Sequence, residues 1–239
     1  MLLRIREIKY KEKYTINKNL YPGEYIKEIA KKIIVKNKAN KFDNLKTSFD
    51  KLKKISLEES MLLIKNDLKQ LGIIHDNFSS ETDLVSKDLV NKAVNKLKEK
   101  NFVEEGFLDP PKGESNKEWK KVKRLIFKSS LFDDDTNRAL QKNDGSWTYF
   151  ANDVAYHMDK IDRKFENLIN VLGADHTGYT KRISAAVLAL SNNKVKLDCK
   201  VCQLVKLFKD GKPFKMSKRS GDFISLKDLL NEVDKDSIR

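Results

Sequence analysis

The sequence predicts an α/β protein whose second half contains a parallel β-sheet. After Gly145, segments of helical, strand, helical and strand character follow one another over 148–160, 167–172, 177–191 and 195–208. Such alternation is typical of βαβ units, because a crossover helix joins each pair of parallel strands. The 239 residues are enough for one large domain or two small ones, each with a buried core.

Helical patterns recur in the first part of the chain and again near its end. Pro22 can open a helix, since proline is tolerated at the first helical position. Apolar residues follow it at helical spacing: Ile26, Ile29, Ala30 and Ile33. A second stripe, which Gly72 would end, contains Leu57, Met61, Ile64, Leu68 and Leu71. After a short strand over 73–78, a third helix contains Leu89, Val90, Ala93, Val94 and Leu97. Ser225 and Asp228 have the spacing of a capping box that opens a further helix.

The segment 101–147 has an irregular pattern. FVEEGFLDPPKGE contains the glycines and prolines of loops and hairpins, and VKRLIFKSSLF predicts a strand. We expect this segment to exclude solvent or to position a substrate.

The chain is strongly basic, with a formal net charge of +14. A basic surface attracts polyanions, because it raises the local concentration of phosphates. However, only eight of the 49 basic residues are Arg, and Lys with abundant Asn and Ile is also what an AT-rich coding sequence produces, so both explanations stay open. No apolar run approaches the roughly 20 residues of a membrane-spanning helix, and the charges near the N-terminus argue against a secretion signal. We therefore expect a cytoplasmic protein without a membrane partner.

Cys199 and Cys202 form a CxxC pair, a spacing found in zinc and redox sites. A structural zinc normally takes four ligands, and the sequence offers no second Cys pair or His pair to complete the set. The pair also falls within the strand predicted over 195–208, where side chains three residues apart point to opposite faces. We interpret both as ordinary strand cysteines and predict no metal site.

A glycine-rich turn follows the strand predicted over 167–172. Gly173 and Gly178 bracket the residues Ala-Asp-His-Thr, and a helix comes next. Open α/β sheets bind nucleotides at such turns, since free backbone N–H groups and the helix dipole face the ligand. The alternative is that the two glycines only shape the turn and that His176 caps the helix.

A basic loop after the tight turn predicted at Asp210-Gly211 is a second candidate site. Lys215, Lys218 and Arg219 lie within five residues, beside Ser and Gly. Three cations in a loop that is hard to bury suit a polyphosphate whose charge rises during a reaction. The alternative is a solvated basic loop without a ligand.

KMSKR at 215–219, together with the G-x-D turn at 173–175, resembles the signatures of class I aminoacyl-tRNA synthetases. Longer strings are similar to successive blocks of bacterial arginyl-tRNA synthetases: GSWTYFANDVAYHMDK (145–160), VLGADHTGYTKRISAAVLAL (171–190) and QLVKLFKDGKPFKMSKRSGDFISLKDLL (203–230). Two further strings fit the same family in the same order: LYPGEYIKEIA (20–30) and EEGFLDPP (104–111). The resemblance therefore covers nearly the whole chain.

The resemblance implies part of a class I synthetase catalytic domain, Rossmann-like, with a helical and hairpin insertion. Residues 1–145 would form the connective insertion, and 146–239 the C-terminal half of the nucleotide-binding part with the KMSKR loop. The family's HxGH signature has no match, because all three histidines stand in other contexts. We expect an internal fragment without the HxGH region and the anticodon-binding domain, inactive alone and with exposed apolar strand faces.

An ATP site is also implied. In the family the KMSKS lysines hold the triphosphate and stabilise departing pyrophosphate, which makes Lys215 and Lys218 the catalytic candidates. The G-x-D element contacts the adenosine, and the methionine of the loop packs near the adenine. The implied ATP-binding residues are Gly173, Asp175, Met216, Ser217 and Lys218. Mg²⁺ usually accompanies the triphosphate.

The resemblance implies an arginine site as well. In the family a tyrosine and an aspartate four residues apart recognise the arginine side chain, and Tyr149 and Asp153 match them on one helix face. A separate apolar row of this helix contains Phe150, Val154 and Met158. A carboxylate forms charge-assisted hydrogen bonds with a guanidinium, and an aromatic ring can stack on it. His176 lies near a family position that helps to hold the amino acid, and His157 either lines the pocket or packs beside it.

The leading prediction is an arginine-tRNA ligase, in which ATP and L-arginine give arginyl-adenylate and pyrophosphate, and arginine passes to the terminal ribose of tRNA(Arg). Two alternatives stay open. One is another class I synthetase, of the cysteine or class I lysine type. The lack of zinc ligands counts against cysteine, and Tyr149 with Asp153 favours a cationic substrate. The other is a non-catalytic RNA-binding remnant, which salt-sensitive tRNA binding without pyrophosphate exchange would favour.

Overall fold

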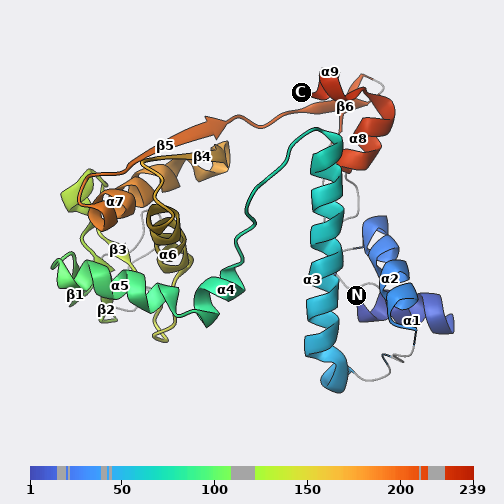
Figure 1. Ribbon diagram of the computed structural model, residues 1–239, viewed down its shortest axis with the longest axis horizontal. Helices are drawn as coiled ribbons and strands as arrows, with labels where there is room; N and C mark the ends of the chain where they lie inside the picture. Colours follow the sequence, from blue (N-terminus) through green and yellow to red (C-terminus); the bar gives the residue numbers. More distant parts are fainter. Residues whose placement is uncertain are drawn as a thin grey trace. The chain divides into compact units, whose positions relative to one another are not determined.

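The computed structural model describes most of the chain as two compact units. The described residues are 1–14, 20, 22–38, 42, 45–108, 122–209, 211–214 and 224–239. We call the unit that combines Met1–Asp76 with Lys206–Arg239 the helical unit, and Asn77–Val205 the α/β unit (Figure 1). Within the described ranges, no helix is long and apolar enough to cross a membrane.

Three helices form the core of the helical unit: α1 (Leu2–Tyr10), α2 (Glu24–Lys36) and α3 (Leu45–Gln70). α2 packs against both of the others. The predicted helix is confirmed as α2, although it begins at Glu24 with Gly23 as its N-cap, so Pro22 precedes the helix. Three of the predicted apolar positions are buried: Ile29, Ala30 and Ile33. Side chains outside α2 complete this core: Ile5, Phe42 and Leu52.

The second apolar stripe is confirmed as a helix, α3, but only Leu71 of its five residues is buried. Leu57 and Ile64 are exposed, whereas Leu52 and Glu59 are buried. Lys36 of α2 donates a hydrogen bond to Glu59 Oε1 at 2.5 Å, and this ion pair turns the 52–59 face toward α2. Because the buried face includes a paired charge, apolar periodicity alone does not identify it.

The helical unit also contains a hairpin and a capped helix. β6 (Leu207–Lys209) pairs antiparallel with β7 (Lys212–Phe214), in agreement with the turn predicted between them. α8 (Leu226–Glu232) begins with the predicted capping box, in which Ser225 and Asp228 satisfy each other's backbone N–H groups. Both local motifs are therefore confirmed.

α3 ends at the predicted stop. Gly72 adopts a φ of +73°, a conformation that favours glycine. Arg239, which follows α9 (Lys235–Ile238), donates a hydrogen bond to the backbone carbonyl of Leu71 at 3.0 Å. The strand predicted over 73–78 is wrong, because these residues pair with no described strand and most of their side chains are exposed. A segment without a partner for its backbone groups cannot form a ladder.

The first half of the α/β unit contains two helices and an antiparallel sheet. Its elements are α4 (Glu81–Ser86), α5 (Leu89–Glu99), β1 (Val103–Gly106), β2 (Arg124–Phe127), the 3-10 turn η1 (Ser129–Phe132) and β3 (Arg138–Ala139). β2 is central and pairs antiparallel with β1 and β3. The strand predicted within VKRLIFKSSLF is confirmed as β2. The third predicted helix is α5, in which Val90, Ala93, Val94 and Leu97 are buried.

The second half of this unit contains a βαβ arrangement, which confirms the α/β prediction (Figure 1). β4 (Asn167–Gly173) and β5 (Lys196–Cys202) run parallel along their whole length. α7 (Thr180–Ser191) is the crossover helix between them, and α6 (Tyr149–Asp162) precedes β4. The helix predicted from residue 177 begins later than expected, because a 3-10 turn, η2 (Ala174–Tyr179), comes first.

The strand predicted over 195–208 is interrupted. β5 ends at Cys202, because its partner β4 ends directly opposite, and the following Leu204 and Val205 are exposed. The chain passes from the α/β unit to the helical unit at this point. Cys199 is half-buried and Cys202 is exposed, as expected of cysteines on opposite faces of a strand.

The core of the α/β unit joins α5, α6 and α7 to the antiparallel sheet through buried residues such as Val94, Phe127, Val154 and Ile183. Ile169 and Val171 of β4 are exposed, as predicted for apolar residues on an uncovered strand face. The predicted boundary between residues 145 and 146 lies inside this unit. The division into an insertion and a nucleotide-binding part therefore does not follow the compact units and stays a prediction.

Candidate active site

One polar face of α6 contains the residues predicted to bind the amino acid. Tyr149 and Asp153 are four residues apart, and Asn152 and Tyr156 extend the same face at three and seven residues from Tyr149. Thr148 fixes the start of the helix, since its side-chain oxygen accepts a hydrogen bond from the first helical turn at 3.2 Å. The predicted apolar row is buried on another face: Phe150, Val154 and Met158.

A cavity of about 280 Å³ lies against the polar face of α6, within the α/β unit. The residues that line it are Ser79, Glu81, Leu84, Tyr149, Asn152, Asp153 and Tyr156. Glu81 and Asp153 contribute two carboxylates, and none of the described lining residues is Lys or Arg. A cavity with this charge favours a cationic ligand. Its volume, at the lower end of ligand cavities, suits a molecule the size of an amino acid.

Asn152 connects two walls of this cavity. Its Nδ2 donates a hydrogen bond to Glu81 Oε1 at 2.5 Å, which joins α6 to the start of α4. This contact fixes the orientation of the amide, because the reverse orientation would place two acceptor oxygens together. Asn152 Oδ1 is buried without a hydrogen-bond partner in the described structure. A donor on a ligand could satisfy it.

Tyr179 holds the carboxylate of Asp153. The tyrosine is the last residue of η2, and its hydroxyl donates a hydrogen bond to Asp153 Oδ2. Burial raises the pKa of Tyr179, and the hydrogen bond to Asp153 raises it further, so the phenol stays protonated. One oxygen of the candidate guanidinium-binding carboxylate is therefore fixed by the protein itself.

His157 lies behind Asp153. The residue is 4% exposed, with Nδ1 2.8 Å from the backbone carbonyl of Asp153 and Nε2 2.9 Å from Asn170 Nδ2. Asn170 Oδ1 accepts a hydrogen bond from Lys160 Nζ at 2.9 Å, so the amide nitrogen donates to His157. The histidine is then neutral, with its proton on Nδ1, and burial lowers its pKa. Of the two roles left open for this residue, the structure supports packing.

The glycine-rich turn follows β4, at the carboxyl end of a parallel strand where such sheets bind ligands. A Cβ on Gly173 would lie 2.6 Å from Asp175 Oδ1, which is the end of an exposed side chain that can move away. At Gly178 an added Cβ would meet no atom within 4 Å. The side chains of Asp175 and His176 are 72% and 56% exposed, and His176 Nε2 lies 3.6 Å from Asp175 Oδ2. Asp175 is thus open to solvent, unlike Asp153.

The structure brings part of the predicted site together. Tyr149 and Asp153 line one cavity. His176 does not line it, although its ring meets that of Tyr179 edge to face at a centroid distance of 6.5 Å, and its role in arginine binding stays a prediction. Four predicted residues lie outside the described residues: Lys215, Met216, Ser217 and Lys218.

Comparison with known protein families shows the family of this chain. The family model described as tRNA synthetases class I (R), catalytic domain, matches residues 5–239. The chain belongs to this family. The match confirms the resemblance seen in KMSKR and in the longer strings of the sequence.

Relatives of this class I (R) synthetase chain agree with the assignment. The arginine–tRNA ligase of Pelagibacter ubique is 56% identical over 240 residues, which cover the whole chain and 42% of the relative. That of Ehrlichia chaffeensis is 47% identical over 97% of the chain and 41% of the relative. A solved structure of a Campylobacter jejuni protein named as an arginyl-tRNA synthetase matches with a TM-score of 0.78 and 30% identity, over 99% of the chain and 48% of that protein. The chain thus spans about two fifths of the length of these curated relatives.

Sequence reasoning missed four residues of the candidate site in this synthetase chain. Asn152 and Tyr156 carry a usable signal, because they share the helix face of Tyr149 at three and seven residues. Glu81 carries none, since only the packing of α4 on α6 brings it to the cavity. Tyr179 appears in the sequence as the first residue of a helical stripe, and nothing local indicates the partner of its hydroxyl.

Proposed function

We propose that this chain supplies the arginine pocket of an arginine–tRNA ligase. The observation that carries the proposal is the cavity on α6, where the carboxylates of Glu81 and Asp153 and the rings of Tyr149 and Tyr156 line one volume. None of the described residues that line the cavity is Lys or Arg, so the two carboxylates favour a ligand with a positively charged side chain. The names of the relatives in this family give arginine as the amino acid, and the cavity has the chemistry that arginine requires.

A guanidinium group matches this cavity in shape and in hydrogen bonding. It carries five N–H donors in one plane, and a carboxylate accepts two of them side by side. Asp153 would accept the guanidinium, and Asn152 Oδ1 offers a further acceptor. A tyrosine ring can stack on the same planar cation. An uncharged amino acid would leave the Asp153 carboxylate unpaired, which is the physical basis of discrimination.

The same chain would contribute to the ATP site. We assign the turn of Gly173 and Asp175 to the adenosine, Met216 to the adenine, and Lys215 and Lys218 to the triphosphate. The arginine carboxylate attacks the α-phosphorus, the bond to pyrophosphate breaks, and arginyl-adenylate forms. A hydroxyl of the terminal ribose of tRNA(Arg) then attacks the activated carbonyl carbon and displaces AMP. The lysine charges would stabilise the departing pyrophosphate, whose negative charge rises as the bond breaks.

Mg²⁺ would enter as part of the ATP substrate. A magnesium ion held on phosphates keeps several waters and needs only one or two protein carboxylates. In the part of the chain that the structure describes, no three His, Cys, Asp or Glu residues form a group that could hold a metal by themselves.

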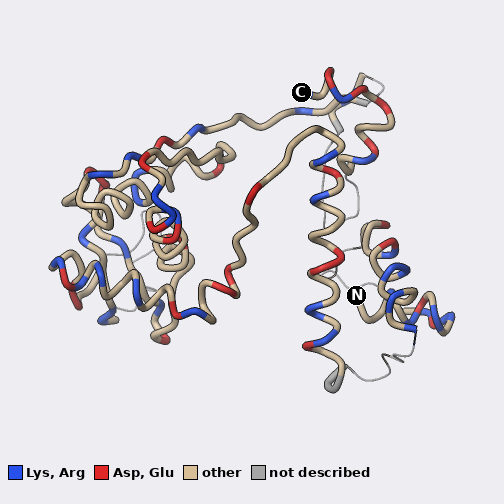
Figure 2. Tube along the Cα trace, in the orientation of Figure 1, with Lys and Arg blue, Asp and Glu red and all other residues tan. Residues whose placement is uncertain are grey.

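A tRNA partner fits the strong positive charge of the chain. The formal net charge is +14, and Lys and Arg recur along the helices of both units, interspersed with Asp and Glu (Figure 2). Basic side chains bind the phosphate backbone by releasing its counterions, so the binding weakens as salt rises. Because tRNA charging belongs to protein synthesis, we propose a cytoplasmic location.

The test is arginine-dependent exchange between ATP and pyrophosphate in the presence of tRNA. It compares the chain alone with the chain joined to a segment that carries the HxGH signature. We expect exchange in the joined protein, loss of exchange on Asp153→Ala or Lys218→Ala, and retention on the matched Lys212→Ala in the neighbouring hairpin. A folded joined protein without exchange would contradict the proposal. Salt-sensitive tRNA binding without exchange would instead support the RNA-binding remnant.

A further inference from the structure

Tyr179 lies between the two candidate binding elements. It is the last residue of η2, the turn that follows β4, and α7 begins at the next residue. Its hydroxyl donates a hydrogen bond to Asp153 Oδ2 on α6. Tyr179 is not among the residues that line the cavity. Its hydroxyl therefore does not contact the proposed arginine pocket directly, but contacts Asp153, whose carboxylate lines it.

Three neighbours fix the ring of Tyr179. Phe150 of α6 meets it edge to face, with ring centroids 6.3 Å apart. His176 meets it edge to face at 6.5 Å. The guanidinium carbon of Arg182 lies 5.1 Å from the ring centroid. Aromatic and cation–π contacts of this kind restrict the ring, so the direction of the hydroxyl is set before a ligand binds.

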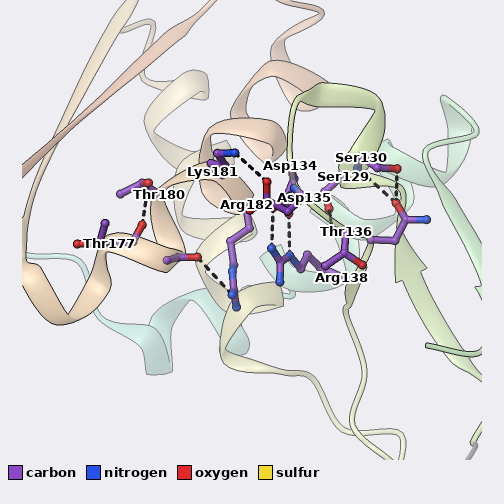
Figure 3. A network of polar contacts seen from close by, with 12 residues as sticks. Ser129, Ser130, Asp134, Asp135, Thr136, Arg138, Thr177, Thr180, Lys181 and Arg182 are labelled. Atoms are coloured by element: carbon purple, nitrogen blue, oxygen red, sulfur yellow. Dashed lines mark hydrogen bonds and ion pairs between the residues drawn. The ribbon is translucent and has the colours of Figure 1, made fainter. Parts of the chain in front are cut away.

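A network of ion pairs anchors the helix that begins after Tyr179 (Figure 3). Arg138 donates two hydrogen bonds to the buried carboxylate of Asp134, at 2.7 and 2.6 Å. Lys181, in the first turn of α7, donates a hydrogen bond to the adjacent Asp135 at 2.8 Å. The segment between η1 and β3 thus contacts the start of α7 through an exposed ion pair, and η1 itself also contacts α7.

We propose that Tyr179 is a positioning residue that sets the preference for arginine by holding Asp153 in the orientation that receives a guanidinium. The proposal rests on the proposed arginine pocket. Each carboxylate oxygen has two acceptor directions, so Oδ2 can accept from the tyrosine and still accept from a ligand. Because the carboxylate is already ordered, binding a guanidinium costs little side-chain freedom. The fixed orientation of the carboxylate increases the affinity of a neutral ligand less, since a neutral ligand donates no hydrogen bond from a charged group.

The test compares Tyr179→Phe with the unmodified 239-residue chain. The variant keeps the ring and removes only the hydroxyl. The dissociation constants of arginine and of citrulline, its neutral isostere, are measured by ligand-observed NMR, and the melting temperature is recorded. We expect the Kd of arginine to rise by up to roughly tenfold, because the Asp153 carboxylate must then be ordered when the ligand binds. The Kd of citrulline should rise by less than about twofold, so the preference for arginine falls.

A matched control is Tyr14→Phe, which removes a hydroxyl that donates to Glu7 at 3.4 Å in the helical unit. We expect both dissociation constants to stay unchanged. Equal weakening of arginine and citrulline by Tyr179→Phe, or a lower melting temperature that accounts for the loss, would overturn the positioning role. Unchanged arginine binding would also overturn it and would leave the proposed function standing. If the unmodified chain binds no arginine, the proposed pocket fails, and this proposal fails with it.

Discussion

The cavity on α6 and the turn after β4 are built differently, although both are proposed to serve one reaction. Asp153 accepts a hydrogen bond from the buried Tyr179, and its backbone carbonyl is held by His157. Asp175 on the turn is largely exposed, and it meets the equally solvent-facing His176 at 3.6 Å. The cavity is therefore ordered before a ligand binds, whereas the turn offers an open carboxylate.

This difference agrees with the two ligands that we propose. A guanidinium must replace water on a carboxylate, and a fixed partner lowers the cost of that exchange. ATP brings several charges of its own, and the proposed lysine partners lie in another segment of the chain. We infer that selection of the amino acid is built into the α/β unit.

The largest effect on stability is expected from the ion pairs of the segment between η1 and β3, which contacts the start of α7 on the ordered side of this comparison. Arg138→Ala leaves the carboxylate of Asp134 unpaired, with its side chain 0% exposed. Breaking a buried ion pair in this way should lower the free energy of unfolding by about 3 kcal/mol or more. Urea denaturation measures it. The matched control is Arg163→Ala, because its partner Asp159 is one third exposed and the same i,i+4 spacing applies.

For this control we expect a loss of less than about 1 kcal/mol, as for other partly exposed pairs. Equal effects of the two variants would show that the buried pair of Arg138 and Asp134 stabilises the protein no more than the partly exposed pair does. The segment between η1 and β3 would then not be an ordered support for the elements beside the cavity.

The next effect concerns arginine itself. Asp153→Asn keeps the size of the side chain and removes its charge, so the Kd of arginine should rise about a hundredfold. Isothermal titration measures it. Asp162→Asn is the matched control, since this exposed aspartate lies on the same helix and does not line the cavity. A change of less than about threefold on Asp153→Asn would locate arginine elsewhere.

A smaller effect should appear as a pH dependence of stability. Burial lowers the pKa of His157 below its ordinary value of 6.5. As the pH falls below this value, the imidazole of His157 becomes protonated in the unfolded chain but stays neutral in the folded protein. The free energy of unfolding should therefore fall by at most about 1.4 kcal/mol per pH unit, until the folded protein also binds the proton.

His157→Gln removes this titration while it retains a side-chain hydrogen-bonding group. Urea denaturation of both proteins between about pH 7.5 and 5.5 checks the prediction. The unmodified chain should lose stability toward the acid end, and the variant should lose less. The same slope in both proteins would show that His157 is not held neutral behind Asp153.

The smallest effect on stability is expected at the turn that contains Gly173 and Asp175. Gly173→Ala would place a Cβ 2.6 Å from Asp175 Oδ1, but the exposed aspartate can move away, so stability should change by less than about 0.5 kcal/mol. In the joined protein, the KM for ATP should rise while the Kd of arginine stays the same. Gly178→Ala is the control, because its Cβ would meet open space. A large effect of Gly173→Ala on arginine binding would show that turn and cavity act as one site.

Local patterns in the sequence predict much of this fold. The helical period identifies α2, α5 and the two faces of α6, and the alternation of elements identifies the βαβ arrangement. The four-residue spacing of Tyr149 and Asp153 is enough to place both on one helix face. Patterns of this kind succeed because neighbours in the sequence are also neighbours in space.

Contacts between distant segments explain what the sequence does not predict. Glu81 reaches the cavity only because α4 packs on α6, and Tyr179 reaches Asp153 only because η2 returns to the same helix. Glu59 is buried because Lys36 pairs with it. In each case the deciding partner lies far away in the chain, so neither periodicity nor composition reveals it.

The measurement that tests the proposed pocket most directly is a crystal structure of the chain with L-arginine bound. We predict that the guanidinium lies in the cavity on α6, within about 3 Å of the Asp153 carboxylate and beside the ring of Tyr149. Asp153 should keep its hydrogen bond to Tyr179 and its position in the absence of ligand. Arginine bound elsewhere, or bound in this cavity with its guanidinium directed to solvent, would contradict the account.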